Sequence, residues 1–193
     1  MNEPTLLLSR LSLTGFKTIR RLEELELGPV NVLIGPNGAG KSNLVSFFRM
    51  LNRMMIPPGN LQLYVARAGG ANTLLHSGAA FTPQMEASLT FKSLKGINDY
   101  RFRLLHAAQD TLIFAEEQYR FAPKRVLPEA AAWIDLGAGQ RESNLLSRAQ
   151  DKTAKSPRTL WRFLVDCVVH QFHNTSETAR IRQRWSITDN WRL

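Results

Sequence analysis

Cysteine, acidic residues and long apolar runs are scarce in this sequence. The 193-residue chain has one cysteine, Cys167, which excludes an internal disulfide. No stretch approaches the roughly 18 apolar residues that a membrane-spanning helix requires. An acidic residue, Glu3, stands where a secretory leader would carry basic ones. With 44% hydrophobic and 21% charged residues, the composition excludes a disordered chain. We therefore expect a folded cytoplasmic protein that makes no contact with a membrane.

The shortage of acidic residues gives the chain a net charge of +9, from 25 basic and 16 acidic side chains. The excess lies mainly at the C-terminal end, where residues 141–193 hold 10 basic and 5 acidic side chains. Such a balance favours polyanionic partners, because their binding releases counterions. A solvated basic face, or a face that meets an acidic subunit, explains the charge equally well. The alternating arginines Arg180, Arg182 and Arg184 predict either a phosphate contact or a covered domain face.

Apolar periodicity predicts an α/β organisation around one glycine-rich loop. Residues 5–16 and 22–27 predict strands, and the apolar run Val30–Ile34 predicts a third, buried strand that leads into the loop. The i, i+3, i+4 spacing after Lys41 predicts an amphipathic helix that stops at Pro57-Pro58-Gly59.

The middle of the chain predicts a set of antiparallel strands. Their expected bounds are Met85–Lys92, Tyr100–His106 and Thr111–Phe121, with turns at 96–99 and 107–110. A short helix is expected at 61–67, and residues 122–158 predict loop with some helix. The apolar stretch Cys167–Phe172 predicts one more strand.

The glycine-rich loop matches the pattern G-x-x-x-x-G-K-[ST] between a β run and a helix. Its residues are Gly35, Pro36, Asn37, Gly38, Ala39, Gly40, Lys41 and Ser42. Glycines let consecutive N–H groups converge on a phosphate, and the helix N-terminus adds its positive dipole end. Lys41 would reach the β- and γ-phosphates, and the Ser42 hydroxyl would ligate Mg²⁺. The sequence thus predicts a site for ATP and Mg²⁺ in which Lys41 and Ser42 serve the chemistry.

The interior of this loop, with Asn43 after it, resembles the SMC, RecF and OLD group of ABC-type ATPases. Residues 13–19 resemble that group's opening strand, and the resemblance implies that Lys17 approaches the bound phosphates. An ordinary exposed lysine is the alternative. Residues 133–143 and 170–176 resemble, more loosely, a bacterial subgroup of RecF-like AAA ATPases. The fold this implies is α/β: the N-terminal lobe of a P-loop NTPase head, with a mixed sheet and an antiparallel β insertion.

The group's C-terminal motifs are not recognisable in the sequence. The run Phe163–Asp166 has the shape of a Walker B strand, but Cys167 follows where the catalytic Glu belongs. Leu136–Gln140 superficially resembles a signature motif. We expect one incomplete head lobe over 1–193. It comprises a strand–P-loop–helix core (1–60), an antiparallel lobe (61–130) and a helical, basic segment (131–193). A complete compact ABC domain built from those two runs is the alternative.

The resemblance implies an ATPase that acts on DNA in repair, recombination or anti-phage defence. ATP would join it to a second head, or to a chain that supplies the missing half. Because the catalytic carboxylate is lacking, we expect this chain to bind ATP and hydrolyse it very slowly. The alternative is a nucleotide-sensing module without turnover; a phosphotransferase fits poorly with the loop's position and with Asn37. Gln84 is either a Mg²⁺ contact or a turn residue.

Overall fold

A computed structural model of the chain describes residues 6–151 and 153–170. In this part of the chain six strands form one sheet of order β2-β1-β3-β4-β5-β6, and all of their pairings are antiparallel. The strands are β1 (Leu7–Phe16), β2 (Ile19–Glu26), β3 (Gln84–Ser93), β4 (Gly96–Ala107), β5 (Thr111–Pro123) and β6 (Ile134–Asp135).

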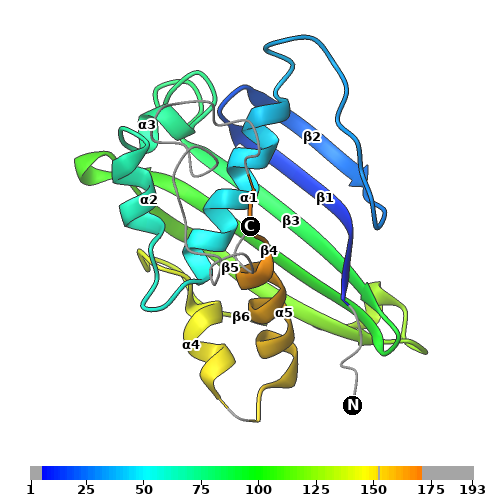
Figure 1. The fold of residues 1–193 in the computed structure, drawn as a ribbon. Coiled ribbons are helices and arrows are strands. Elements are labelled where there is room, and N and C mark those ends of the chain that lie inside the picture. The colour runs from blue at the N-terminus through cyan, green and yellow to red at the C-terminus, as the bar shows by residue number, and fades with distance from the viewer. Residues whose placement is uncertain (1–5, 152, 171–193) are drawn as a thin grey trace, which may run out of the picture.

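The helices gather on one face of this sheet and leave the other face uncovered (Figure 1). They are α1 (Lys41–Met55), α2 (Leu61–Arg67), α3 (Ala71–Leu74), α4 (Asn144–Gln150) and α5 (Lys155–Asp166), with 3-10 turns at Ala108–Asp110 and Pro128–Ala130. The core lies between the two layers. One face of α1 is buried against the sheet through Leu44, Phe47, Met50, Leu51, Met54 and Met55.

Alternation along the strands decides which side chains reach that core. Leu89 and Phe91 of β3 lie opposite Tyr100 and Asn98 of β4, and all four are buried beneath the helices. The intervening residues of both strands point to the uncovered face. Complete burial of one large apolar side chain contributes about 1.5–3 kcal/mol, so this shared layer makes α1 and the sheet one unit.

The expected α/β class is confirmed, and so are the strands expected at 5–16 and 22–27 and the three in the middle of the chain. The helix expected at 61–67 has those bounds. The segments 1–60 and 61–130 share a single sheet, because β1 pairs with β3 from Leu7 to Thr14. The turn expected at 96–99 is wrong: residues 96–99 belong to β4, and the chain turns at 94–95.

The described residues form no strand at two other apolar runs. Val30–Ile34 is a non-regular connection and pairs with no strand there. The run Phe163–Asp166, which only the compact-domain alternative makes a Walker B strand, is helical, as the last turn of α5. Residues 167–170 have no regular structure, and the remainder of the run Cys167–Phe172 lies outside the described residues, as does the arginine tail. No helix in the described part is both long and apolar enough to cross a bilayer.

Candidate nucleotide-binding site

The glycine-rich loop forms the entry to α1. Residues 35–39 are exposed, and the helix begins at Lys41. Gly38 and Gly40 have φ values of 85° and 89°, a left-handed conformation that side chains with a Cβ seldom adopt. The first turn of α1 contains no acidic residue, so nothing opposes an anion at this positive helix end. Loop and helix are therefore arranged as an anion-binding N-terminus.

The Lys41 side chain lies over the loop itself. Its Nζ donates to the backbone carbonyl oxygens of Gly35 at 2.5 Å and of Pro36 at 2.7 Å. Both contacts are exposed, so water can replace these bonds and they contribute little to stability. The ammonium is thus held at the mouth of the loop, where a phosphate oxygen would compete with the two carbonyls for its protons. Ser42 is exposed on the first turn beside it.

The turn between β1 and β2 braces the start of α1. The Asn43 side-chain amide donates to the Thr18 hydroxyl at 2.7 Å. A Cβ added at Gly40 would lie 3.3 Å from the same hydroxyl, so the turn and the loop fit closely. Sequence reasoning found Asn43 and Lys17 but missed Thr18. The available signal was its position directly after Lys17 in the run that resembles the opening strand of the SMC, RecF and OLD group.

Lys17 is fixed by its backbone and points along α1. Its N–H donates to Leu74 O at 2.8 Å, its carbonyl contacts His76 Nδ1 at 2.7 Å, and its φ is 49°. The ammonium donates to the Ser46 hydroxyl at 3.0 Å, one helical turn beyond Ser42. Burial lowers the pKa of Lys17, and the positive charge of Arg49 lowers it further. A second cation is therefore placed on α1 about one turn beyond Ser42.

The approach to the loop carries an unusual amount of exposed apolar surface. Val30, Val32 and Ile34 are 84%, 76% and 91% exposed. Their connection leaves the end of β2 and returns past that edge strand to the start of α1 (Figure 1). The expected buried strand fails here for a physical reason: an apolar run is buried only where neighbouring strands cover it and share its hydrogen bonds. The described residues supply no such neighbour.

The one carboxylate with a Walker B-like context lies far from Ser42. Asp166 ends α5, and the adjacent Val165 carbonyl accepts a bond from Asn52 in the C-terminal half of α1. Asn52 is ten residues beyond Ser42, or about 15 Å along the helix. The structure therefore contradicts the compact-domain alternative, in which Phe163–Asp166 is a strand beside the phosphates.

The signature-like run Leu136–Gln140 has a local structural role. Gly139 N donates to Phe114 O at 2.7 Å, and Phe114 N donates to Gln140 O at 2.9 Å, so the run is pinned to β5. The Gln140 side chain bonds the carboxylate of the buried Glu117 at 3.2 Å. These contacts account for the glutamine without a nucleotide, and φ values of 103° and 86° account for Gly137 and Gly139.

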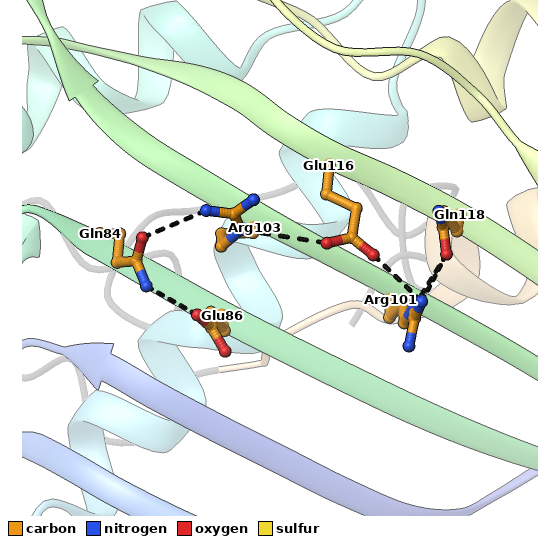
Figure 2. Close-up of polar contacts among 6 residues, drawn as sticks. All are labelled: Gln84, Glu86, Arg101, Arg103, Glu116 and Gln118. Carbon is orange, nitrogen blue, oxygen red and sulfur yellow. Dashed lines mark hydrogen bonds and ion pairs between the residues drawn. The ribbon is translucent and has the colours of Figure 1, made fainter.

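Gln84 lies on the uncovered face of the sheet, whereas α1 lies on the covered face. Figure 2 shows its side chain between Glu86, to which it donates at 2.7 Å, and Arg103. Arg103 and Arg101 both pair with Glu116 on this face, at 3.9 and 3.1 Å. The Gln84 side chain is thus used in a surface network, and this arrangement does not bring it to a Mg²⁺ ion at Ser42.

The chain is similar to one described family of ATPase domains. The family described as "AAA domain, putative AbiEii toxin, Type IV TA system" matches residues 30–190, which include the loop, α1 and most of the sheet. No curated protein is similar enough to the chain to count as a relative. A match of this extent, with a glycine-rich loop correctly placed before a helix, gives the chain its class: it belongs to the AAA domain family of putative AbiEii toxins of type IV TA systems, a family of P-loop ATPase domains.

Proposed function

We propose that this chain is the nucleotide-binding part of an ATPase of the SMC, RecF and OLD type. The loop at the N-terminus of α1 carries the proposal, because it presents left-handed glycines, the Lys41 ammonium and free helix N–H groups to one point. Mg²⁺ would be held by the Ser42 hydroxyl and by phosphate oxygens. Lys17, braced against α1, would supply a second positive charge to the phosphates.

Efficient hydrolysis at the proposed site requires a carboxylate other than Asp166. The attacking water has to be oriented or deprotonated, and Asp166 lies at the far end of α1. The apolar connection at Val30, Val32 and Ile34 is exposed next to the loop, which suits an approaching protein surface. We therefore propose that a second ATPase head, or a chain carrying the missing motifs, closes over the nucleotide and that ATP drives this association.

DNA is the proposed target of the nucleotide cycle. The support is the net charge of +9 and the basic excess over residues 141–193. Among repair, recombination and anti-phage defence, the family description, with its putative toxin of a type IV TA system, favours defence. A fall in DNA affinity with rising salt is expected, since phosphate contacts release counterions.

Calorimetry with Mg²⁺ and ATP tests the nucleotide site. The wild-type chain is expected to bind only when Mg²⁺ is present, and Lys41→Ala to lower the affinity at least about tenfold, since hydrogen bonds to charged groups contribute about 1.5–3 kcal/mol. Lys92→Ala is the matched control, because Lys92 is exposed on β3, outside the site. Wild-type protein without magnesium-dependent affinity for ATP would overturn the proposal.

A non-hydrolysing, nucleotide-sensing module is the second candidate. The observation that favours it is the placement of Asp166 in a helix, with Cys167 directly after it. Phosphate release in single-turnover experiments, with and without DNA, separates the two functions. Stimulated release that is lost in Lys41→Ala supports an ATPase, and tight binding with no release under either condition supports the sensor.

A further inference from the structure

A cavity of about 520 Å³ lies under α5, at the end of the sheet where β3, β4 and β5 meet. This volume falls in the range of small-molecule sites, about 300–1,000 Å³. It is separate from the glycine-rich loop, since the Trp161 indole of α5 donates to Met55 O at the far end of α1. The lining residues are Leu6, Ser93, Lys95, Asn98, Phe121, Lys155, Ser156, Arg158, Thr159, Arg162, Phe163 and Asp166.

Asn98 is a polar residue on an otherwise apolar strand face. Its neighbours in register, Phe91 and Phe121, and the next residue on the same face, Tyr100, are all aromatic. Asn98 is 3% exposed, and among the described residues its side-chain amide makes no hydrogen bond. The next residue, Asp99, points to the opposite face, where it pairs with Arg120 at 2.7 Å. The Asn98 amide lines the cavity, so a ligand in the cavity would pair with it in place of solvent.

Positive charge surrounds the opening of the cavity. Lys95 comes from the turn after β3, and Lys155 from the first turn of α5. Both are exposed, and neither has a side-chain partner among the described residues. The 12-residue helix α5 has no side-chain cap and no acidic residue in its first turn, so its N-terminal end adds to the same field. Asp166 is the single carboxylate among the lining residues and lies at the other end of α5.

Two aromatic side chains complete the lining. Phe163 packs edge-to-face on Phe91 at 4.9 Å between centroids, so its ring is held in a fixed orientation beside the cavity. Phe121 approaches from β5, on the same strand face as Asn98. Aromatic faces stack with nucleobases, and an asparagine amide offers one donor and one acceptor that match the edge of a base such as adenine.

We propose that this cavity binds a nucleoside monophosphate unit, with the base between Phe121 and Phe163 and against Asn98, and the phosphate at Lys95, Lys155 and the N-terminus of α5. The same unit occurs as a free nucleotide and as the phosphorylated end of a nucleic acid strand. The site is independent of the ATP site proposed above. Through this site the chain would bind a second nucleotide or the end of a nucleic acid strand.

Titration of AMP into the Lys41→Ala chain tests this proposal, because that background removes the main cation of the glycine-rich loop. AMP is expected to bind, and both Asn98→Leu and Lys155→Ala are expected to weaken it about tenfold, the loss of one well-placed hydrogen bond or charge contact. Lys92→Ala is expected to leave binding unchanged, because Lys92 is an exposed lysine on the opposite face of β3 and does not line the cavity. Asn98→Leu is also expected to leave the melting temperature unchanged, since the two side chains have similar volumes and the Asn98 amide bonds no other described residue.

Competition experiments distinguish a free nucleotide from a strand end as the source of the bound unit. A 5′-phosphorylated adenine oligonucleotide that displaces AMP, where its 5′-hydroxyl counterpart fails, assigns the site to strand ends; displacement by AMP analogues alone assigns it to free nucleotides. Three results would overturn the proposal: no AMP binding at millimolar concentration, AMP binding unaffected by Asn98→Leu, or inorganic phosphate competing as well as AMP. A lower melting temperature in Asn98→Leu with intact AMP binding would give Asn98 a structural role instead.

Discussion

Replacement of the buried Glu117 is the most informative test of how the helical layer is held on the sheet. Glu117 is fully buried on β5, and its oxygens accept bonds from the Tyr100 hydroxyl at 2.7 Å, the Asn144 N–H at 2.8 Å and the Ser143 hydroxyl. These bonds cap the first turn of α4 from β5, on the covered face of the sheet. The pKa of Tyr100 is raised well above its usual range by burial and by the negative charge of Glu117.

The expected magnitudes follow from this set of donors. Glu117→Leu leaves the Tyr100 hydroxyl and the Asn144 N–H unpaired in the core, so the free energy of unfolding should fall by about 3–5 kcal/mol, as when one partner of a buried charged network is removed. Glu117→Gln retains one acceptor for Asn144, and the hydroxyls of Tyr100 and Ser143 can rotate to accept from its amide. Its expected loss is about 1–2 kcal/mol.

Urea denaturation followed by circular dichroism measures both losses. Glu116→Leu is the matched control, because the neighbouring Glu116 lies on the uncovered face and only pairs with Arg101 and Arg103. Partly exposed ion pairs contribute about 0–1 kcal/mol, so the control should change little. If Glu117→Leu costs no more than Glu116→Leu, then the network does not stabilise the fold and the reasoning is refuted.

The remaining predictions concern the loop, Lys17 and the thiol. Lys17→Met should lower Mg-ATP affinity in calorimetry while raising the melting temperature near neutral pH, since burial and Arg49 disfavour the charged lysine; a lower melting temperature would contradict this. Because the folded pKa of Lys17 lies below 10.5, wild-type stability should rise as the pH increases from that folded pKa to 10.5, and Lys17→Met should lack this rise. Gly38→Ala and Gly40→Ala both force a Cβ into left-handed backbone, but only the second meets Thr18, so Gly40→Ala should lower the melting temperature more; equal shifts would show that the close fit is unimportant. Burial and the charge of Asp166 raise the pKa of Cys167 from 9.0 to about 11, so its labelling by iodoacetamide at pH 8 should be about a hundredfold slower than that of an unperturbed thiol, and restored in urea.

Much of the sheet follows from the sequence because its signal is local. Alternation within single strands was enough for β1, β3, β4 and β5, and the loop pattern located the start of α1. Val30–Ile34 could not be placed in this way, since burial of an apolar run depends on what lies beside it. α5 was missed for a different reason. The buried residues Pro157, Leu160 and Leu164 have helical spacing. The four-residue run Phe163–Asp166, taken alone, is too short to show this spacing.

The contacts that position the candidate site and the helical layer join residues far apart in the chain. Asn43 meets Thr18 across 25 residues, and Glu117 meets Asn144 across 27. Neither pair has a periodic signal, because the match depends on which strand edges and helix ends the fold brings together. The sequence therefore predicts which residues touch phosphate, whereas the contacts that hold those residues in place are visible only in the structure.

The pairing of β1 with β3 sets an order for folding during synthesis. Leu13 lies opposite Ala87, so the inner neighbour of β1 leaves the ribosome about 70 residues later, a delay of about 4–15 s at ordinary elongation rates. Until then β1 lacks its second neighbouring strand, and most of the sheet against which the apolar face of α1 packs has not been made. A nascent chain of this protein would depend on chaperones over that interval, and a translational pause before β3 should increase aggregation more than one after β5.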